Sequence, residues 1–268
     1  MRRQPLLFLV AIQFLTRLPV PHLEGFQESW LSQSTRYFPL VGALVGWIGV
    51  AVWWISSKCF PPAVAVGLMM SASLLLTGAF HEDGFADVCD GFGGGRSRDA
   101  VLSIMKDSRI GAYGAIGIVM MLGLKWSILT SQPPAAFPAI VVGAHAASRW
   151  CTIGLIWKLR YVRTGADGKS RALAGNFGGA DWLLSGVLGA PALLPVFLTV
   201  SSGARPRLAL GLLAALAFSA ASTFAAGAYF RNRIGGYTGD CLGAAQQVAD
   251  LGFLLAAFGT LAALQWTG

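Results

Sequence analysis

Charged residues are scarce in this chain of 268 residues, at 12% of the sequence against the roughly 25% of ordinary soluble domains. A soluble fold of this size needs a polar exterior, and the sequence supplies too little of one. The same scarcity excludes a disordered chain and a coiled coil, because both are rich in charged side chains. Hydrophobic residues make up 55% of the chain and the mean hydropathy is +0.61, which is typical of a protein dissolved in lipid.

Cysteine is also rare, and its spacing gives no sign of a disulfide scaffold. The four cysteines, Cys59, Cys89, Cys151 and Cys241, form no C-x-x-C pair, so we expect free thiols in or facing a reducing compartment. A cleavable signal peptide is not indicated either. The apolar stretch 5–20 contains an arginine and lacks a small-residue cleavage site.

Positive charge is in excess, with 20 Lys and Arg against 12 Asp and Glu, which gives a net charge of +8. In a soluble protein this excess would suggest a nucleic acid partner. In a membrane protein the positive-inside bias and the attraction of anionic lipids explain it. We therefore expect the lipid bilayer, and no nucleic acid, as a partner.

Seven apolar segments are long enough to cross the hydrocarbon core, which takes about 20 residues of helix. Their apolar runs are continuous rather than alternating, which favours helices over a β-barrel. The predicted spans are residues 38–57, 62–80, 112–130, 137–157, 182–200, 208–230 and 248–266. The stretch 5–20 is too short to span and is interpreted as an interfacial or re-entrant helix. The predicted fold class is all-α, a polytopic membrane helical bundle forming one catalytic domain over residues 1–268.

The loops between these spans divide the charges unequally between the two sides of the membrane. Loops 1–37, 81–111, 158–181 and 231–247 carry 15 Lys and Arg, and the other side carries three. This asymmetry places the first side in the cytoplasm. Eleven of the twelve acids lie on that side, all but Asp250 at the entrance of the last span, so we expect the chemistry at the cytoplasmic mouth.

The densest group of acids follows the second span, in residues 81–91 (HEDGFADVCDG). If the helix continues past the membrane edge, Asp83, Asp87 and Asp90 fall at i, i+4 and i+7 and share one face. Carboxylates this close repel one another unless a cation lies among them, and Mg²⁺ prefers oxygen ligands. The spacing therefore predicts a divalent metal site; the alternative interpretation is a solvated acidic helix end.

A second polar segment (KDSRIGAYG) precedes the third span. Asp107 adds a candidate fourth metal carboxylate, and Lys106 and Arg109 are cations suited to phosphate. Gly111 and Gly114 would let backbone N–H groups approach an anion at the start of a helix. The alternative is an ordinary positively charged flank of a membrane span.

A glycine-rich segment, residues 231–244, leads into the last span. Such turns bind phosphate through their N–H groups, and Asp240 adds a carboxylate, but a simple turn between two spans is equally consistent with the pattern. Arg149 lies inside the fourth span, where a charge is either paired internally or used to bind phosphate. Lys125 and His145 are interpreted as structural.

Four stretches of the sequence closely resemble the cobalamin synthase (adenosylcobinamide-GDP ribazoletransferase) family. They are residues 13–21 (QFLTRLPVP), residues 82–91 (EDGFADVCDG) with 105–114 (MKDSRIGAYG), and residues 236–244 (GYTGDCLGA). The chain departs from the family pattern at Cys241, where threonine is more frequent.

The resemblance implies a polytopic enzyme of the cell inner membrane that needs Mg²⁺ and has its active site facing the cytoplasm. Such an enzyme joins adenosylcobinamide-GDP to α-ribazole or α-ribazole 5′-phosphate and releases GMP, late in cobalamin biosynthesis.

The residues of the expected site fall into three groups. The metal ligands are Asp83, Asp87, Asp90 and Asp107; the catalytic residues are Asp87, Asp90, Lys106 and Arg109; and the substrate-binding residues are Glu82, Arg149, Gly236, Thr238, Gly239 and Asp240. Lys106 and Arg109 would hold phosphate oxygens, and Asp90 would accept the proton of the ribazole 5′-hydroxyl.

Two other functions stay open. Residues 87–91 also resemble the start of the CDP-alcohol phosphotransferase motif, but Gly94 and Gly95 stand where that motif has alanine and arginine. A secondary transporter would couple the acids to an ion, yet such sites usually lie near the membrane midplane. The number of metal ions, the phosphorylation state of the ribazole and a homo-oligomer are left open as well.

Overall fold

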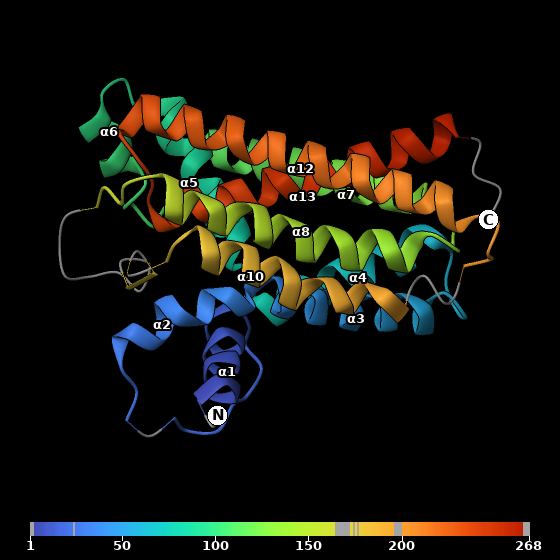
Figure 1. The fold of residues 1–268 in the computed structure, drawn as a ribbon. Helices are drawn as coiled ribbons and strands as arrows, with labels where there is room; N and C mark the ends of the chain where they lie inside the picture. Colours follow the sequence, from blue (N-terminus) through green and yellow to red (C-terminus); the bar gives the residue numbers. More distant parts are fainter. Residues whose placement is uncertain are drawn as a thin grey trace.

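The computed structural model describes residues 3–23, 25–163, 172–173, 175, 177–195 and 200–264, and this part of the chain is a bundle of helices without β-strands (Figure 1). The all-α prediction is therefore confirmed. The elements are α1 (Arg3–Leu15), α2 (Glu28–Ser34), η1 (Thr35–Tyr37), α3 (Phe38–Ser56), α4 (Pro62–Thr77), α5 (Phe80–Gly94), α6 (Arg98–Ile104), α7 (Ala112–Thr130), α8 (Phe137–Lys158), α10 (Gly179–Gly189), η2 (Ala190–Leu193), α12 (Arg205–Ile234) and α13 (Gly239–Ala263).

Five helical segments are long and apolar enough to cross a membrane, so the chain has the make-up of a multi-pass membrane protein. They are Glu28–Ser56, Ala112–Thr130, Phe137–Lys158, Arg205–Ile234 and Gly239–Ala263. The pair α4 and α5 meets the same test only when the two are taken together, which would make six. The predicted count of seven is thus not reached among the described residues.

The second predicted span is shorter than expected, because the chain breaks at Gly78 and Ala79. Both residues have left-handed backbone, with φ of 67° and 55°, and a run of left-handed residues cannot continue an α-helix. α4 therefore ends at Thr77, and α5 begins at Phe80 with its axis bent by 88° from that of α4. The expectation that one helix continues past the membrane edge was wrong, since the acids lie on a separate helix.

The last predicted span was placed too late in the sequence. α13 begins at Gly239, where the Thr238 hydroxyl accepts a hydrogen bond from the N–H of Cys241 at 3.3 Å. Asp250 is therefore buried well inside this helix and not at its entrance. The predicted span 182–200 corresponds to α10 and η2, and its residues 196–199 lie outside the described part of the chain.

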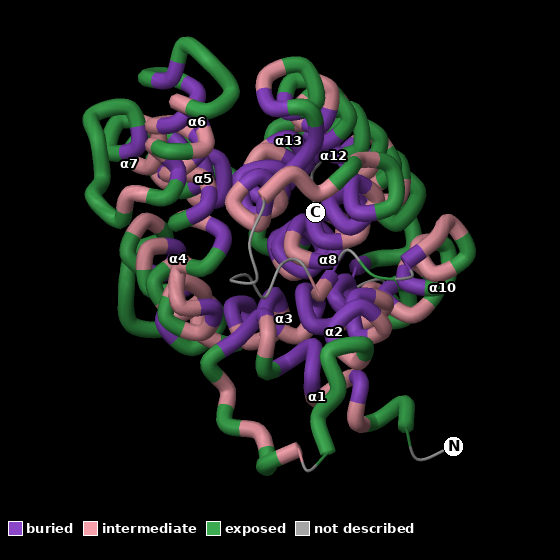
Figure 2. The backbone as a smooth tube through the Cα atoms, turned by 90° about the vertical axis from the view of Figure 1, so that its left-hand side faces the viewer, coloured by how far each residue is buried: buried purple, intermediate pink, exposed green. Residues whose placement is uncertain are grey.

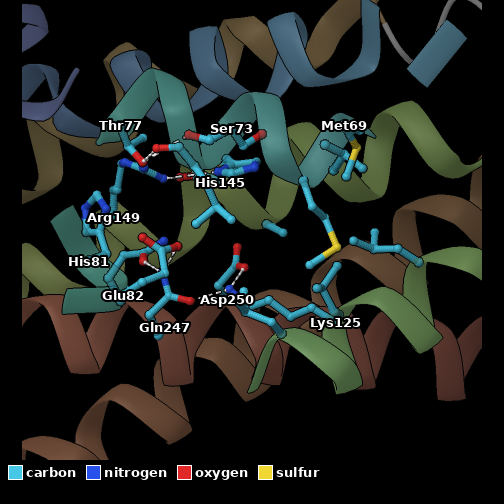
Figure 3. Close-up of a pocket in the computed structure, with 18 residues that line it drawn as sticks. Met69, Ser73, Thr77, His81, Glu82, Lys125, His145, Arg149, Gln247 and Asp250 are labelled. Carbon is cyan, nitrogen blue, oxygen red and sulfur yellow. Dashed lines mark hydrogen bonds and ion pairs between the residues drawn. The ribbon is translucent and has the colours of Figure 1, made fainter. Parts of the chain in front are cut away.

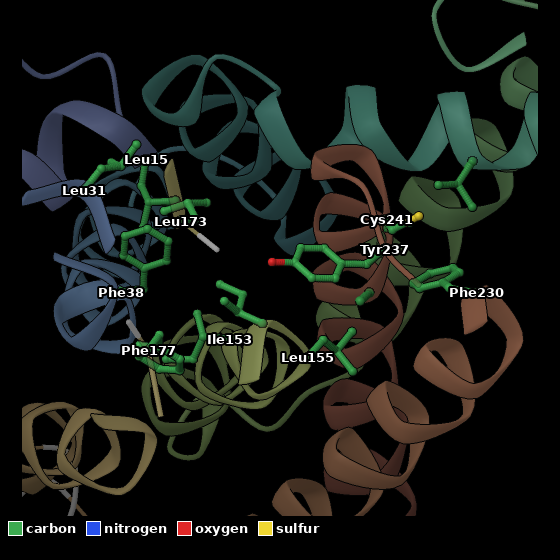
Figure 4. Close-up of a cluster of buried hydrophobic side chains, with 14 of the residues drawn as sticks. Leu15, Leu31, Phe38, Ile153, Leu155, Leu173, Phe177, Phe230, Tyr237 and Cys241 are labelled. Carbon is green, nitrogen blue, oxygen red and sulfur yellow. The ribbon is translucent and has the colours of Figure 1, made fainter. Parts of the chain in front are cut away.

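The short helix α1 packs against the bundle through a buried apolar cluster. Leu15 from α1 and Leu31 from α2 lie in the same cluster as Phe38, Ile153 and Tyr237, from α3, from α8 and from the turn before α13 (Figure 4). At 13 residues α1 is too short to cross a bilayer, which agrees with the prediction of an N-terminal helix that does not span.

Burial differs strongly among the spanning helices. The helix α8 lies at the centre of the bundle (Figure 2). The most apolar stretch of α8 is 78% buried, whereas the corresponding stretches of α7 and α12 are each 28% buried. The outward faces of α7 and α12 carry large exposed apolar side chains such as Val119, Met120 and Phe224. In water such a surface would be a liability, but against lipid it is the expected exterior.

Three of the loops predicted to share one side of the membrane do meet at one end of the bundle, here called the polar end. Tyr237 N–H donates to Arg160 O at 2.9 Å, and Val162 N–H donates to Tyr237 O at 3.0 Å, which joins the end of α8 to the start of α13. Arg233 at the end of α12 donates to Phe92 O and to Gly95 O, at 3.1 and 2.8 Å. The polar end thus brings together the end of α5, α6, the start of α7 and the α12–α13 turn (Figure 1).

Candidate active site at the polar end

Asp83, Asp87 and Asp90 all lie on α5, as their i, i+4, i+7 spacing predicted. Two glycines let α5 approach α13 closely. A Cβ on Gly84 would lie 2.9 Å from the Cα and carbonyl oxygen of Asp240, and one on Gly243 would lie 3.0 Å from a carbonyl of α5. This close approach brings the carboxylate of Asp240 to the face of α5 that carries Asp83 and Asp87.

The carboxylate of Asp87 shows the consequence of this crowding. Asp87 lies on α5, outside the five spanning helices. The pKa of Asp87 is raised from 3.8 to about 7. Burial of the side chain is the largest cause, the carboxylates of Asp240 and Asp83 add to it, and Arg163 opposes them. A strongly perturbed carboxyl group of this kind is typical of functional sites.

Arg163 is the cation of this cluster, and the sequence did not single it out. Its guanidinium donates to Asp240 Oδ2 at 2.7 Å and to Met105 O at 3.0 Å, so it ties α13 to the loop before α7. In the sequence it is one of 15 basic residues on the predicted cytoplasmic side, and no spacing distinguishes it from the others.

The side chain of Asp90, on α5, reaches the start of α7. Its carboxylate accepts the N–H of Gly111 at 2.7 Å and the N–H of Gly114 at 2.8 Å. These are the N–H groups that the sequence predicted to receive an anion, and the anion that lies there is a side chain of α5. The positive end of the α7 dipole favours this placement.

Asp107 and Arg109 pair with each other on the exposed α6–α7 loop, at 2.6 Å. The hydrogen bonds from Arg109 lower the pKa of Asp107 to about 2. Lys106 beside them is exposed. The structure therefore does not bring Asp107 into one group with the α5 carboxylates, and its role as a metal ligand stays a prediction.

The glycine-rich turn before α13 is packed rather than open. Gly236 lies so close to Arg160 O that no side chain fits there, and Tyr237 and Thr238 are fully buried. The backbone N–H of Tyr237 is already bonded to Arg160 O. Contact of Gly236, Thr238 and Gly239 with a substrate stays a prediction.

Arg149 and Glu82 line a cavity inside the bundle, between α4, α5, α7, α8 and α13 (Figure 3). Arg149 is 3% exposed and donates to His145 O at 2.9 Å, and none of the ion pairs found among the described residues includes it. Glu82 Oε1 accepts a hydrogen bond from Gln247. Lys125, interpreted as structural, forms a buried ion pair with Asp250 at 2.6 Å.

The donor set of the cluster suits Mg²⁺, because Asp83, Asp87 and Asp240 offer only carboxylate oxygens. Burial is the largest cause of the raised pKa of Asp87, and the carboxylates of Asp240 and Asp83 add to it, an effect that a bound cation would oppose. As the side chains lie, no three His, Cys, Asp or Glu residues in the described part of the chain converge closely enough to hold a metal. A metal would therefore require the carboxylates to rotate toward one another.

The fold and this cluster define a multi-pass helical membrane protein with an acidic site at one end of its bundle. The chain belongs to the cobalamin-5-phosphate synthase family, whose model matches residues 7–258. This finding confirms the resemblance seen in the sequence, and the match covers nearly all of the chain.

Curated relatives cover the chain almost completely. Proteins named adenosylcobinamide-GDP ribazoletransferase are 44% identical in Ralstonia nicotianae over 246 residues, 43% in Leptothrix cholodnii over 251 and 40% in Shewanella frigidimarina over 256. The aligned regions cover 90%, 91% and 93% of this chain and 90%, 92% and 92% of the relatives, respectively. No solved structure matches the chain.

Proposed function

We propose that the chain transfers adenosylcobinamide phosphate from adenosylcobinamide-GDP to α-ribazole, or to α-ribazole 5′-phosphate, and releases GMP. Family membership and the names of the relatives support the reaction class. The observation that supports the polar end as the active site is the crowding of Asp83, Asp87 and Asp240 there. Phosphoryl transfer depends on positioning and on neutralising charge, and a cation held by this cluster would supply the positive charge.

We propose Mg²⁺ as the cofactor, held by Asp83 and Asp87 of α5 and by Asp240 of α13. Bound there, Mg²⁺ would offset the negative charge of the diphosphate and of the departing GMP. The predicted ligands Asp90 and Asp107 have other partners in this structure, Asp90 the start of α7 and Asp107 the side chain of Arg109.

The proposed roles of the side chains follow from their positions at the polar end. Lys106 and Arg109 are exposed, Arg109 would have to leave its pair with Asp107 to reach a phosphate, and Arg163 already faces the carboxylates. Asp90 is held by two backbone N–H groups and keeps further lone pairs, which suits it to accept the proton of the ribazole 5′-hydroxyl.

We further infer that the polar end faces the cytoplasm and that the protein lies in the cell inner membrane. The excess of 15 Lys and Arg on the loops of this side over three on the other supports this orientation. A cytoplasmic site would meet its nucleotide substrate directly.

The test is incubation of the purified protein with adenosylcobinamide-GDP, α-ribazole and Mg²⁺, with GMP measured by chromatography and EDTA as the control. We expect GMP release that EDTA abolishes. CMP release from a CDP-alcohol would instead show that the protein is a CDP-alcohol phosphotransferase. Flux of the substrate into proteoliposomes without GMP would select a transporter.

A further inference from the structure

A chain of polar side chains crosses the interior of the bundle from α7 to α5, here called the Lys125–Gln247–Glu82 chain (Figure 3). Lys125 Nζ donates to Gln247 Oε1 at 2.6 Å, and Gln247 Nε2 donates to Glu82 Oε1 at 2.8 Å. Asp250 anchors the first residue through its ion pair with Lys125 at 2.6 Å. The chain thus links α7, α13 and α5.

These groups are costly to bury in the interior of a membrane protein. Lys125, Gln247 and Asp250 are 7%, 2% and 5% exposed. Apolar residues that pack well often stabilise a protein as much as a buried ion pair does, so stability alone is a weak reason for this arrangement. The best-attested use of such groups is to select one packing arrangement among several.

The joint before α5 does not set the rotation of this helix, and the contacts of Asp90 with the start of α7 lie in its later turns. α5 follows the left-handed residues Gly78 and Ala79 and is bent by 88° from α4, so the rotation of α4 does not determine that of α5. Glu82 is in the first turn of α5 and directly precedes Asp83. A hydrogen bond to Glu82 therefore restricts how α5 turns about its own axis.

We propose that the Lys125–Gln247–Glu82 chain is a positioning element that holds α5 in the rotation at which its carboxylates face α13. This inference rests on the proposed function, because the Lys125–Gln247–Glu82 chain would position the carboxylates of the proposed active site. The adjoining cavity has a water-accessible volume of about 60 Å³, room for a few water molecules. Water there would satisfy Glu82 Oε2, Asp250 Oδ1 and Arg149 Nε, buried atoms that form no hydrogen bond within the protein.

The neighbouring glutamine provides a matched control. Gln246 is 3% exposed and lies on the same helix. It donates to Ser148 Oγ of α8 at 2.9 Å and accepts from Gln247 Nε2 at 2.9 Å, but it has no hydrogen bond to α5. Gln247→Leu removes the link to α5, whereas Gln246→Leu leaves it in place. Both variants bury the same apolar side chain in the place of the same amide.

The first measurement is GMP release as a function of Mg²⁺ concentration. For Gln247→Leu we expect the Mg²⁺ concentration of half-maximal activity to rise about tenfold or more, which is the usual effect of losing a residue that orients metal ligands. For Gln246→Leu we expect a change within about twofold, whatever its melting temperature. An equal shift in both variants, or none in Gln247→Leu, would overturn the proposal.

The second measurement does not depend on activity. Cys89 on α5 is half-buried, and its Sγ packs against Gly117 of α7. In a Cys59→Ser background, which removes the exposed thiol, the rate of Cys89 alkylation by a maleimide reports the rotation of α5. We expect a several-fold change in Gln247→Leu and none in Gln246→Leu.

The two measurements separate the two hypotheses. If wild-type protein releases no GMP, the proposed function fails, and the Cys89 rate alone then decides whether the chain orients α5. An unchanged rate in Gln247→Leu overturns the positioning role even if GMP release is normal. Should Gln247→Leu not yield folded protein, Gln247→Asn, which shortens the amide by one methylene, replaces it in both measurements.

Discussion

The polar end and the interior of the bundle both gather charged side chains, but they balance them differently. In the interior, Lys125 and Arg149 face Asp250 and Glu82, so the cavity is close to neutral. At the polar end, the carboxylates of Asp83 and Asp240 both act on Asp87. Arg163 is the one cation among the charges that shift the pKa of Asp87. The charges of the interior balance one another, whereas the carboxylate cluster of the polar end has more negative than positive charge, and this difference supports the proposal that a cation binds there.

Replacing the central carboxylate of the polar end should have the largest effect on activity. Asp87→Asn should lower GMP release by roughly 10²–10⁴-fold, because it removes one negative charge from the proposed Mg²⁺ site. It should not lower stability at pH 8. The pKa of Asp87 is raised from 3.8 to about 7, so its ionisation costs stability as the pH rises through that range, and Asn avoids the cost.

Asp99→Asn is the control for that variant, since the Asp99 side chain is 91% exposed on α6 and should leave both GMP release and thermal melting unchanged. Near-normal GMP release by Asp87→Asn would remove the polar end from the proposed reaction.

The opposite pattern is expected in the interior. Lys125→Met leaves Asp250 buried without its partner and should destabilise the protein by about 3–5 kcal/mol. The double variant Lys125→Met/Asp250→Leu should recover most of this loss, because both charges are gone. Unfolding in a denaturing detergent measures the three proteins, and a double variant no more stable than the single one would contradict this account of the interior.

The close approach of the two helices should tolerate no extra methyl group. Gly84→Ala places a Cβ 2.9 Å from the backbone of Asp240, so α5 and α13 must separate, and we expect GMP release to fall about tenfold or more. Gly123→Ala on α7 meets open space and should raise stability by about 0.5–1 kcal/mol. Equal effects of the two substitutions on GMP release would show that the contact does not matter.

A smaller effect on stability is expected where α5 meets the start of α7. Asp90→Ala removes the acceptor of the N–H groups of Gly111 and Gly114, and the loss of such a helix-start acceptor costs about 0.5–2 kcal/mol. Thermal melting of Asp90→Ala and of the exposed control Asp99→Ala measures this cost, and identical curves would exclude the contact.

The smallest effect is expected on the exposed loop. The pKa of Asp107 is lowered from 3.8 to about 2, so the pair with Arg109 contributes above pH 4 and its contribution is lost as the pH falls from about 4 to about 2. Both side chains are in water, where such pairs contribute little. The melting temperatures of wild type and Asp107→Asn should therefore nearly coincide from pH 7 to pH 4, and a large gap would contradict the exposed geometry.

The sequence predicted the parts of the site that depend on local spacing. The helical stripe of Asp83, Asp87 and Asp90 follows from a spacing of about one helical turn, and the structure has that helix. The anion-binding start of α7 also follows from Gly111 and Gly114, although the anion found there is Asp90.

The parts that depend on contacts between distant segments could not be predicted. Arg163 gains its importance from its contacts with Asp240, 77 residues away, and with Met105, 58 residues away. Gln246 and Gln247 lower the hydropathy of residues 239–247, so the last span was placed too late, although both are buried against polar partners. Ala79 carries no sign of its left-handed backbone, because alanine normally favours helix.

The joint at Gly78 and Ala79 also bears on how the protein responds to its bilayer. A change in bilayer thickness alters the tilt of helices that cross it. α4 ends before this joint, while α5 is held by α7 and α13, so tilting of α4 is absorbed in two residues before it reaches the carboxylates. We therefore expect the site to respond less to bilayer thickness than the spanning helices around it do.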